Sequence, residues 1–129
     1  MTWTIQDSDA CYQISSWGSG YFSINENGEL IVQTEGEQVS VVDIVAELNR
    51  KDIALPVVIR FQNILRDRVQ KLNQLFQQTI TKLDYQGQYR GVYPIKVNQM
   101  RDVVQGIVSA GEPYDFGLEA GSKPEILSV

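Results

Sequence analysis

The sequence predicts an α/β fold in which a small β-rich segment precedes an alternation of strands and helices. Two short strand-like runs lie within residues 17–34, and residues 63–83 repeat apolar side chains at spacings of three and four. From residue 56 onward, three strand-like runs alternate with three helix-like runs, which favours parallel strands joined by right-handed crossovers. An open sheet and a (β/α)8 barrel both satisfy this pattern.

The length of the chain predicts an incomplete domain. A complete (β/α)8 barrel needs roughly 250 residues, whereas this chain has 129 and its last predicted helix has only begun at residue 129. We therefore expect residues 1–54 to form an N-terminal hairpin and helix segment, and residues 55–129 to form the truncated start of the barrel.

Composition limits the classes of function. The net charge of -5 and the pI near 4.6 disfavour a surface that binds nucleic-acid phosphates. No run reaches the ~18 to 20 apolar residues of a membrane span, and a signal-peptide pattern is missing, so we expect a cytoplasmic protein without a membrane partner. The chain has no histidine and a single cysteine, Cys11, which excludes histidine catalysis and an internal disulfide within these residues.

The N-terminal elements follow from turn and capping signals. Residues 21–25 and 29–34 flank an Asn-Gly turn at Gly28 and predict an antiparallel hairpin. Ser40, with Asp43 three positions later, predicts a capping box that opens a helix over residues 41–51. After the break at Pro56, residues 56–61 read as another strand.

The rest of the chain predicts two further strand and helix pairs. Asn63 is expected to cap a long helix that ends at Leu83. Its predicted apolar face consists of Leu65, Val69, Leu72, Phe76, Ile80 and Leu83. The expected elements after it are a strand over 89–97, a helix over 101–110 ended by Gly111, a strand over 114–119 and a helix from about Ser122.

Lys96 is the main candidate for chemistry. Alternation along the strand 89–97 places Val92, Pro94 and Lys96 on one face, with Lys96 at the carboxyl end, where ligands bind in open α/β sheets and barrels. Desolvation of a lysine at such a position destabilises the charged ammonium and favours the neutral amine. The neutral amine can attack a carbonyl, which is Schiff-base chemistry. The alternative is a lysine that leaves the strand for solvent.

Two carboxylates are candidates for the same site. Glu119 ends the next strand, so we expect it to flank one site together with Lys96. Glu125 stands three positions after Ser122, so it also fits a capping box that satisfies the first amides of the last helix. Position alone leaves a structural and a catalytic role open for both carboxylates.

Two motifs carry a resemblance to a known family. The stretches VYPIKVNQ at residues 92–99 and GLEAGSKPE at residues 117–125 closely resemble biosynthetic arginine decarboxylases. These are pyridoxal-phosphate enzymes of the alanine racemase and ornithine decarboxylase fold group. The resemblance also takes in WGSGYF at 17–22, LPVVIRF at 55–61 and SAGEP at 109–113, and it reaches the last residue.

The resemblance implies an enzyme that converts L-arginine to agmatine and CO2 for polyamine synthesis. Lys96 matches the lysine that holds pyridoxal 5'-phosphate as a Schiff base at the end of the first barrel strand, and Glu119 and Glu125 match acidic positions of the active site. The family also implies magnesium and a homo-oligomer, although no metal ligand set is visible. It further implies that residues 56–61 belong to a separate β-domain, which leaves two barrel strands.

The family's remaining cofactor and substrate groups have no counterpart in these residues. These groups are the phosphate loop, the ring-stacking histidine, the carboxylate at the ring nitrogen and a cysteine near the substrate. We therefore expect the 129-residue chain alone to be inactive.

Three other readings stay open. The chain could belong to a related amino-acid decarboxylase or racemase, which would keep the same lysine. It could also be a non-catalytic paralogue or regulatory subunit of the same fold, in which the helix 63–83 binds a partner. A general sugar- or phosphate-binding α/β domain explains the architecture but neither motif.

Overall fold

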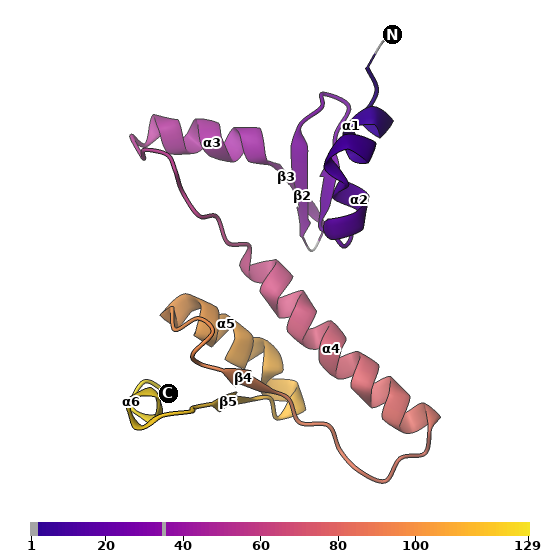
Figure 1. Ribbon diagram of the computed structural model, residues 1–129, viewed down its shortest axis with the longest axis vertical. Coiled ribbons are helices and arrows are strands. Elements are labelled where there is room, and N and C mark those ends of the chain that lie inside the picture. The colour runs from indigo at the N-terminus through magenta and orange to yellow at the C-terminus, as the bar shows by residue number, and fades with distance from the viewer. Residues whose placement is uncertain (1–2, 35) are drawn as a thin grey trace. The chain divides into compact units, whose positions relative to one another are not determined.

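The computed structural model describes residues 3–34 and 36–129, which divide into two units, Met1–Arg60 and Phe61–Val129 (Figure 1). The predicted domain boundary lies slightly earlier, between residues 54 and 55. Residues 55–60 thus group with the first unit rather than with the second. The division into domains of a longer protein stays a prediction.

The first unit contains a three-stranded antiparallel sheet of β1 (Phe22–Ile24), β2 (Leu30–Thr34) and β3 (Glu37–Ser40), in that order. The predicted hairpin is confirmed, with Ser23 opposite Ile31. Its turn is stabilised by the side-chain oxygen of Asn25, which accepts hydrogen bonds from the amides of Asn27 and Glu29. β3 was not predicted from the sequence.

Two short helices precede the sheet and were not predicted either. They are α1 (Ile5–Tyr12) and α2 (Ile14–Trp17), and both contact β1 (Figure 1). Thr4 and Asp7 form a reciprocal capping box at the start of α1. The buried side chains of Ile14 on α2 and of Val32 on β2 belong to the apolar core.

The helix predicted after residue 40 is confirmed as α3 (Val41–Arg50), but its expected capping box is wrong. The Ser40 hydroxyl accepts a hydrogen bond of 3.2 Å from the amide of Val42 instead of the amide of Asp43. Ser40 also donates to the carboxylate of Glu29, which ties the start of α3 to the sheet.

The predicted strand over residues 56–61 is wrong for this chain. Those residues form no strand, and they follow a cis peptide bond between Leu55 and Pro56. The reason is the lack of a pairing partner among the described residues, because a strand needs a neighbour to satisfy its amides and carbonyls. Val58 is 75% exposed, which shows that its apolar side chain has no cover here.

The second unit begins with α4 (Gln62–Lys82), which packs against α5 (Arg101–Gly111) (Figure 1). The predicted long helix is confirmed, but its N-cap residue is Phe61, and Asn63 lies inside the helix. The predicted core face is only partly covered. Leu83 is 70% exposed, because α5 has 11 residues and cannot cover a helix of 21.

The two predicted barrel strands are present but shorter than expected. They are β4 (Val92–Pro94) and β5 (Gly117–Glu119), which pair in parallel with Tyr93 opposite Leu118. Together with α5 they form a βαβ unit, and a one-turn 3-10 helix at Glu112–Tyr114 leads into β5. A last short helix, α6 (Lys123–Ile126), follows. The buried apolar side chains of the second unit are Ile95, Val103, Ile107 and Ala110.

Among the helices of residues 3–34 and 36–129, none combines the length and the apolar character needed to cross a bilayer.

Candidate functional site

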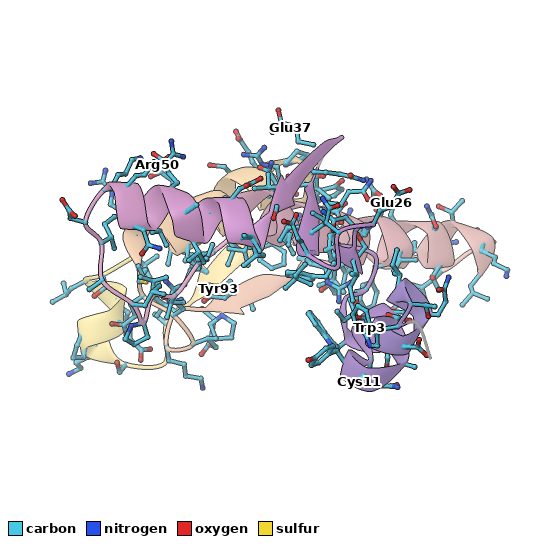
Figure 2. The ribbon with its side chains drawn as sticks, turned by 90° about the horizontal axis from the view of Figure 1, so that it is seen from above. Trp3, Cys11, Glu26, Glu37, Arg50 and Tyr93 are labelled. Carbon is cyan, nitrogen blue, oxygen red and sulfur yellow. The ribbon has the colours of Figure 1, made fainter. Side chains whose placement is uncertain are left out.

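The loop after β4 carries Lys96. Pro94 ends the strand because it has no amide to donate, and the amide of Val97 turns back to donate to the carbonyl of Pro94 at 3.1 Å. The hydroxyl of Tyr93, labelled on β4 in Figure 2, donates to the carbonyl of Asn98 at 3.2 Å. The Asn98 side chain in turn accepts from the amide of Met100 at the start of α5. The loop is therefore anchored at both ends.

Lys96 was expected at the carboxyl end of a strand over 89–97, but β4 ends at Pro94 and Lys96 lies in the turn two residues later. Its neighbour Ile95 is 2% exposed, whereas the Lys96 side chain is exposed. Within residues 3–34 and 36–129, the Lys96 amine makes no hydrogen bond or salt bridge. The side chain is thus accessible, but these residues do not bury it.

Glu119 lies beside this loop at the end of β5. It pairs with Pro94, and its carbonyl accepts a hydrogen bond of 2.9 Å from the amide of Ile95. The Glu119 side chain is half-buried. The structure therefore brings Lys96 and Glu119 to the same edge of the sheet, the carboxyl edge of two adjacent parallel strands.

Glu125 approaches Glu119 around Gly121. A Cβ atom at Gly121 would lie 3.5 Å from Oε1 of Glu119 and 3.5 Å from Oε2 of Glu125, so the two oxygens are separated by at most twice that distance. Oε2 of Glu125 also accepts a hydrogen bond of 2.6 Å from the amide of Gly121, and Ser122 accepts from the amide of Glu125. The Ser122 hydroxyl thus caps α6, but the expected capping box is only half formed, because the Glu125 carboxylate accepts from the amide of Gly121 and not from that of Ser122. The two carboxylates lie near one another on either side of Gly121.

The described residues contain no group of three His, Cys, Asp or Glu side chains that could hold a metal ion. Cys11 lies exposed on α1, in the first unit (Figure 2).

Three residues that have structural roles in the second unit were not predicted from the sequence. Tyr93 and Asn98 hold the Lys96 loop, and Asn73 is the one buried residue of α4. For Asn73 a signal was present, since it stands between Val69 and Phe76 at the spacing of the apolar face. A polar residue at such a position requires a hydrogen-bond partner.

Comparisons with known proteins point to one group. No family model matches the chain. The biosynthetic arginine decarboxylase of Gloeobacter violaceus is 46% identical over 128 residues, which is 97% of this chain and 20% of that protein. The biosynthetic arginine decarboxylase of Pseudomonas putida is 47% identical over 130 residues, or 98% of this chain and 20% of that protein.

A solved structure agrees with the sequence comparison. The biosynthetic arginine decarboxylase SpeA from Campylobacter jejuni matches 90% of this chain and 20% of its own, with a TM-score of 0.81 and 33% identity. The chain spans about one fifth of the length of these proteins. In sequence and in fold, the chain is therefore similar to a segment of the biosynthetic arginine decarboxylases.

Proposed function

We propose that this chain is the N-terminal part of a pyridoxal-phosphate-dependent arginine decarboxylase that forms agmatine and CO2 from L-arginine. One observation carries the proposal. The amine of Lys96, which has no partner among the described residues, lies at the carboxyl edge of two parallel strands. The chain that carries it is 44–47% identical to segments of proteins named biosynthetic arginine decarboxylase. Such an edge is where barrel and open-sheet enzymes bind their ligands.

The residues at this edge fit one part of the cofactor. Lys96 offers a primary amine of the kind that binds the pyridoxal aldehyde, and the anchored loop fixes where that amine can reach. When bound, pyridoxal phosphate supplies the electron sink for the pair of electrons that loss of CO2 leaves behind. The exposed side of Lys96 requires cover from other parts of a longer protein, which would exclude water from the amine.

The two carboxylates have different tasks in this proposal. Glu119 is half-buried at the same edge as Lys96 and has no helix to cap, so it is suited to orient a cationic group of the substrate or cofactor. Glu125 accepts a hydrogen bond from the amide of Gly121 and so holds the loop between β5 and α6, which begins directly after Glu119. We therefore assign Glu119 to the reacting groups and Glu125 to positioning.

Other properties of the proposed enzyme rest on the resemblance alone. These are closure of the barrel, dependence on magnesium, assembly into a homo-oligomer, work in the cytoplasm and a role in polyamine synthesis. A related decarboxylase or racemase would share Lys96, so the substrate needs its own test.

The test measures CO2 release by the full-length protein that contains this chain, with L-arginine, L-ornithine and L-lysine offered separately, and racemisation of L-alanine. We expect turnover of L-arginine with agmatine as product, and a loss of roughly a thousandfold or more in Lys96→Ala. Lys96→Arg keeps the charge but not the nucleophile, so it should be equally impaired. Full activity of Lys96→Ala, or turnover of another amino acid alone, would contradict the proposal.

The 129-residue chain alone should release no agmatine, because it lacks the covering residues that the site requires. Measurable agmatine formation by the purified chain would show that the site is complete within these residues.

A further inference from the structure

Gly117 begins β5, and no described residue requires a glycine at that position. Its φ is not positive, and a Cβ atom added to it would meet a single atom within 4 Å, Cγ1 of Val92 at an ordinary 3.6 Å. A glycine inside a strand weakens the strand, because it has no side chain to pack and loses more conformational freedom on folding than any other residue. The reason for Gly117 therefore lies outside these contacts.

The other glycines differ from Gly117 in this respect. Most of them have either a positive φ or a neighbour that a Cβ atom would approach to less than 3.0 Å. The first group is Gly20, Gly28 and Gly36, and the second is Gly18, Gly87, Gly91, Gly106 and Gly111. Gly121 has neither, but it lies in the loop after β5, where glycine is common. Among the described residues, Gly117 is the one glycine that lies within a strand.

Gly117 lies on the face of the sheet that α5 leaves uncovered. Side chains alternate along a strand, so Leu118 lies on one face, and Gly117 and Glu119 lie on the other. Leu118 lines a groove together with Val108 of α5, so α5 covers the Leu118 face. Val92, which pairs with Gly117, is 55% exposed. In the part of the chain that the structure describes, the face at Gly117 is therefore open.

The open face has a shape and a chemistry that suit a flat aromatic ring. Its floor consists of the Gly117 backbone, the Val92 side chain opposite it, and Pro94, which lies on the same face two residues later. These residues carry no charged or polar side chain, and the missing Cβ atom of Gly117 leaves the floor flat. Two residues of a strand span roughly 7 Å, which gives room for one six-membered ring beside Glu119. Lys96 follows Pro94 by two residues, so it lies at the end of this floor.

We propose that Gly117 keeps this floor flat so that the pyridine ring of pyridoxal phosphate can lie against it. The inference rests on the proposed function, because Lys96 would bind the aldehyde of the same cofactor. A Cβ atom at Gly117 would stand between the ring and the backbone and lift the ring away. Gly117 would thus act on the binding of the cofactor rather than on the choice of amino acid.

The test titrates pyridoxal phosphate into the cofactor-free full-length protein and follows the absorbance of the bound cofactor. We expect Gly117→Ala to weaken binding roughly tenfold, because its Cβ atom crowds the ring, and Gly117→Val to weaken it further. Val92→Ala should weaken binding roughly threefold through lost apolar contact. Val108→Ala changes an exposed valine on the side of the sheet that α5 covers, so it is the matched control and should bind normally.

Unfolding of the cofactor-free variants separates this role from packing. We expect cofactor-free Gly117→Ala to be at least as stable as the wild type. If a side chain elsewhere in the longer protein packs on Gly117, Gly117→Ala lowers the free energy of unfolding without cofactor, and that result would overturn the proposal.

Two outcomes of the titration distinguish this inference from the proposed function. Unchanged affinity in Gly117→Ala, beside a wild type that binds the cofactor, would overturn the inference and leave the proposed function standing. A wild type that binds no pyridoxal phosphate would overturn both.

Discussion

The hydroxyl of Tyr93 donates a hydrogen bond to the carbonyl of Asn98, and this bond closes the loop that carries Lys96. We predict that Tyr93→Phe loosens the loop by removing a bond worth about 0.5–1.5 kcal/mol. In the full-length protein, kcat should fall up to about tenfold with little change in KM, because the loop positions the amine rather than the substrate.

The control is Tyr85→Phe, which removes a hydroxyl from an exposed tyrosine outside this loop. Steady-state kinetics of the Tyr93→Phe and Tyr85→Phe variants measure the change in kcat and KM. If both variants show the same kcat, the Tyr93 hydroxyl does not position Lys96.

Close packing of Phe116 against α5 gives a prediction about stability. A Cβ atom at Gly111 would collide with the Cβ of Phe116, whose amide donates to the Gly111 carbonyl at 3.1 Å. Gly111→Ala should therefore lower the free energy of unfolding by about 1–3 kcal/mol through overpacking. Gly117→Ala is the control, because its Cβ would meet Val92 at an ordinary 3.6 Å. Denaturant unfolding of the full-length variants measures the difference, and equal losses would contradict this account.

The junction of α1 and α2 gives a prediction about pH. The hydroxyl of Ser15 and then its amide donate to the carboxylate of Asp9, and they hold the pKa of Asp9 below its usual 3.8. Because the folded pKa is depressed, this interaction stabilises the fold above about pH 4 and is lost as the pH falls through the folded pKa.

Ser15→Ala should therefore raise the pKa of Asp9 toward 3.8, as measured by NMR titration of its carboxyl carbon. The pKa of Asp7 should stay low in the same variant, since its cause is the hydrogen bonding of Thr4. An unchanged pKa of Asp9 would show that Ser15 is not its cause.

Glu125 offers a way to separate capping from chemistry. Glu125→Gln keeps an oxygen that can accept from the amide of Gly121, whereas Glu125→Ala removes the acceptor. For a positioning residue we expect Glu125→Gln to retain most of the activity and Glu125→Ala to lose stability by about 0.5–2 kcal/mol. Thermal unfolding and kinetics on both variants test this. Equal loss of activity with unchanged stability in both would instead assign Glu125 to the reacting groups.

Local signals predicted the elements that depend on local interactions. The Asn-Gly turn at Gly28, the cap at Ser40 and the repeat from Leu65 to Leu83 each predict an element that the structure contains. The pattern from Thr4 to Asp7 is a further local signal, because its capping box marks the start of α1, a helix that was not predicted.

The failures concern interactions that are not local. Residues 56–61 have strand composition, but strand formation depends on a neighbour that sequence pattern does not supply. The strand expected over 89–97 ends at Pro94, since the backbone turns there and places Lys96 in the loop. The sequence predicted that Lys96 and Glu119 share one edge, whereas the approach of Glu125 to Glu119 depends on the path of the chain around Gly121.

The most direct test of the central claim is to locate the pyridoxyl group. The full-length protein is prepared with pyridoxal phosphate, reduced with borohydride and analysed by peptide mass mapping. We predict the label on Lys96, with no label on the peptide that carries it in the folded Lys96→Arg variant. A folded wild-type protein whose Lys96 stays unlabelled would contradict the assignment and favour a non-catalytic protein of the same fold.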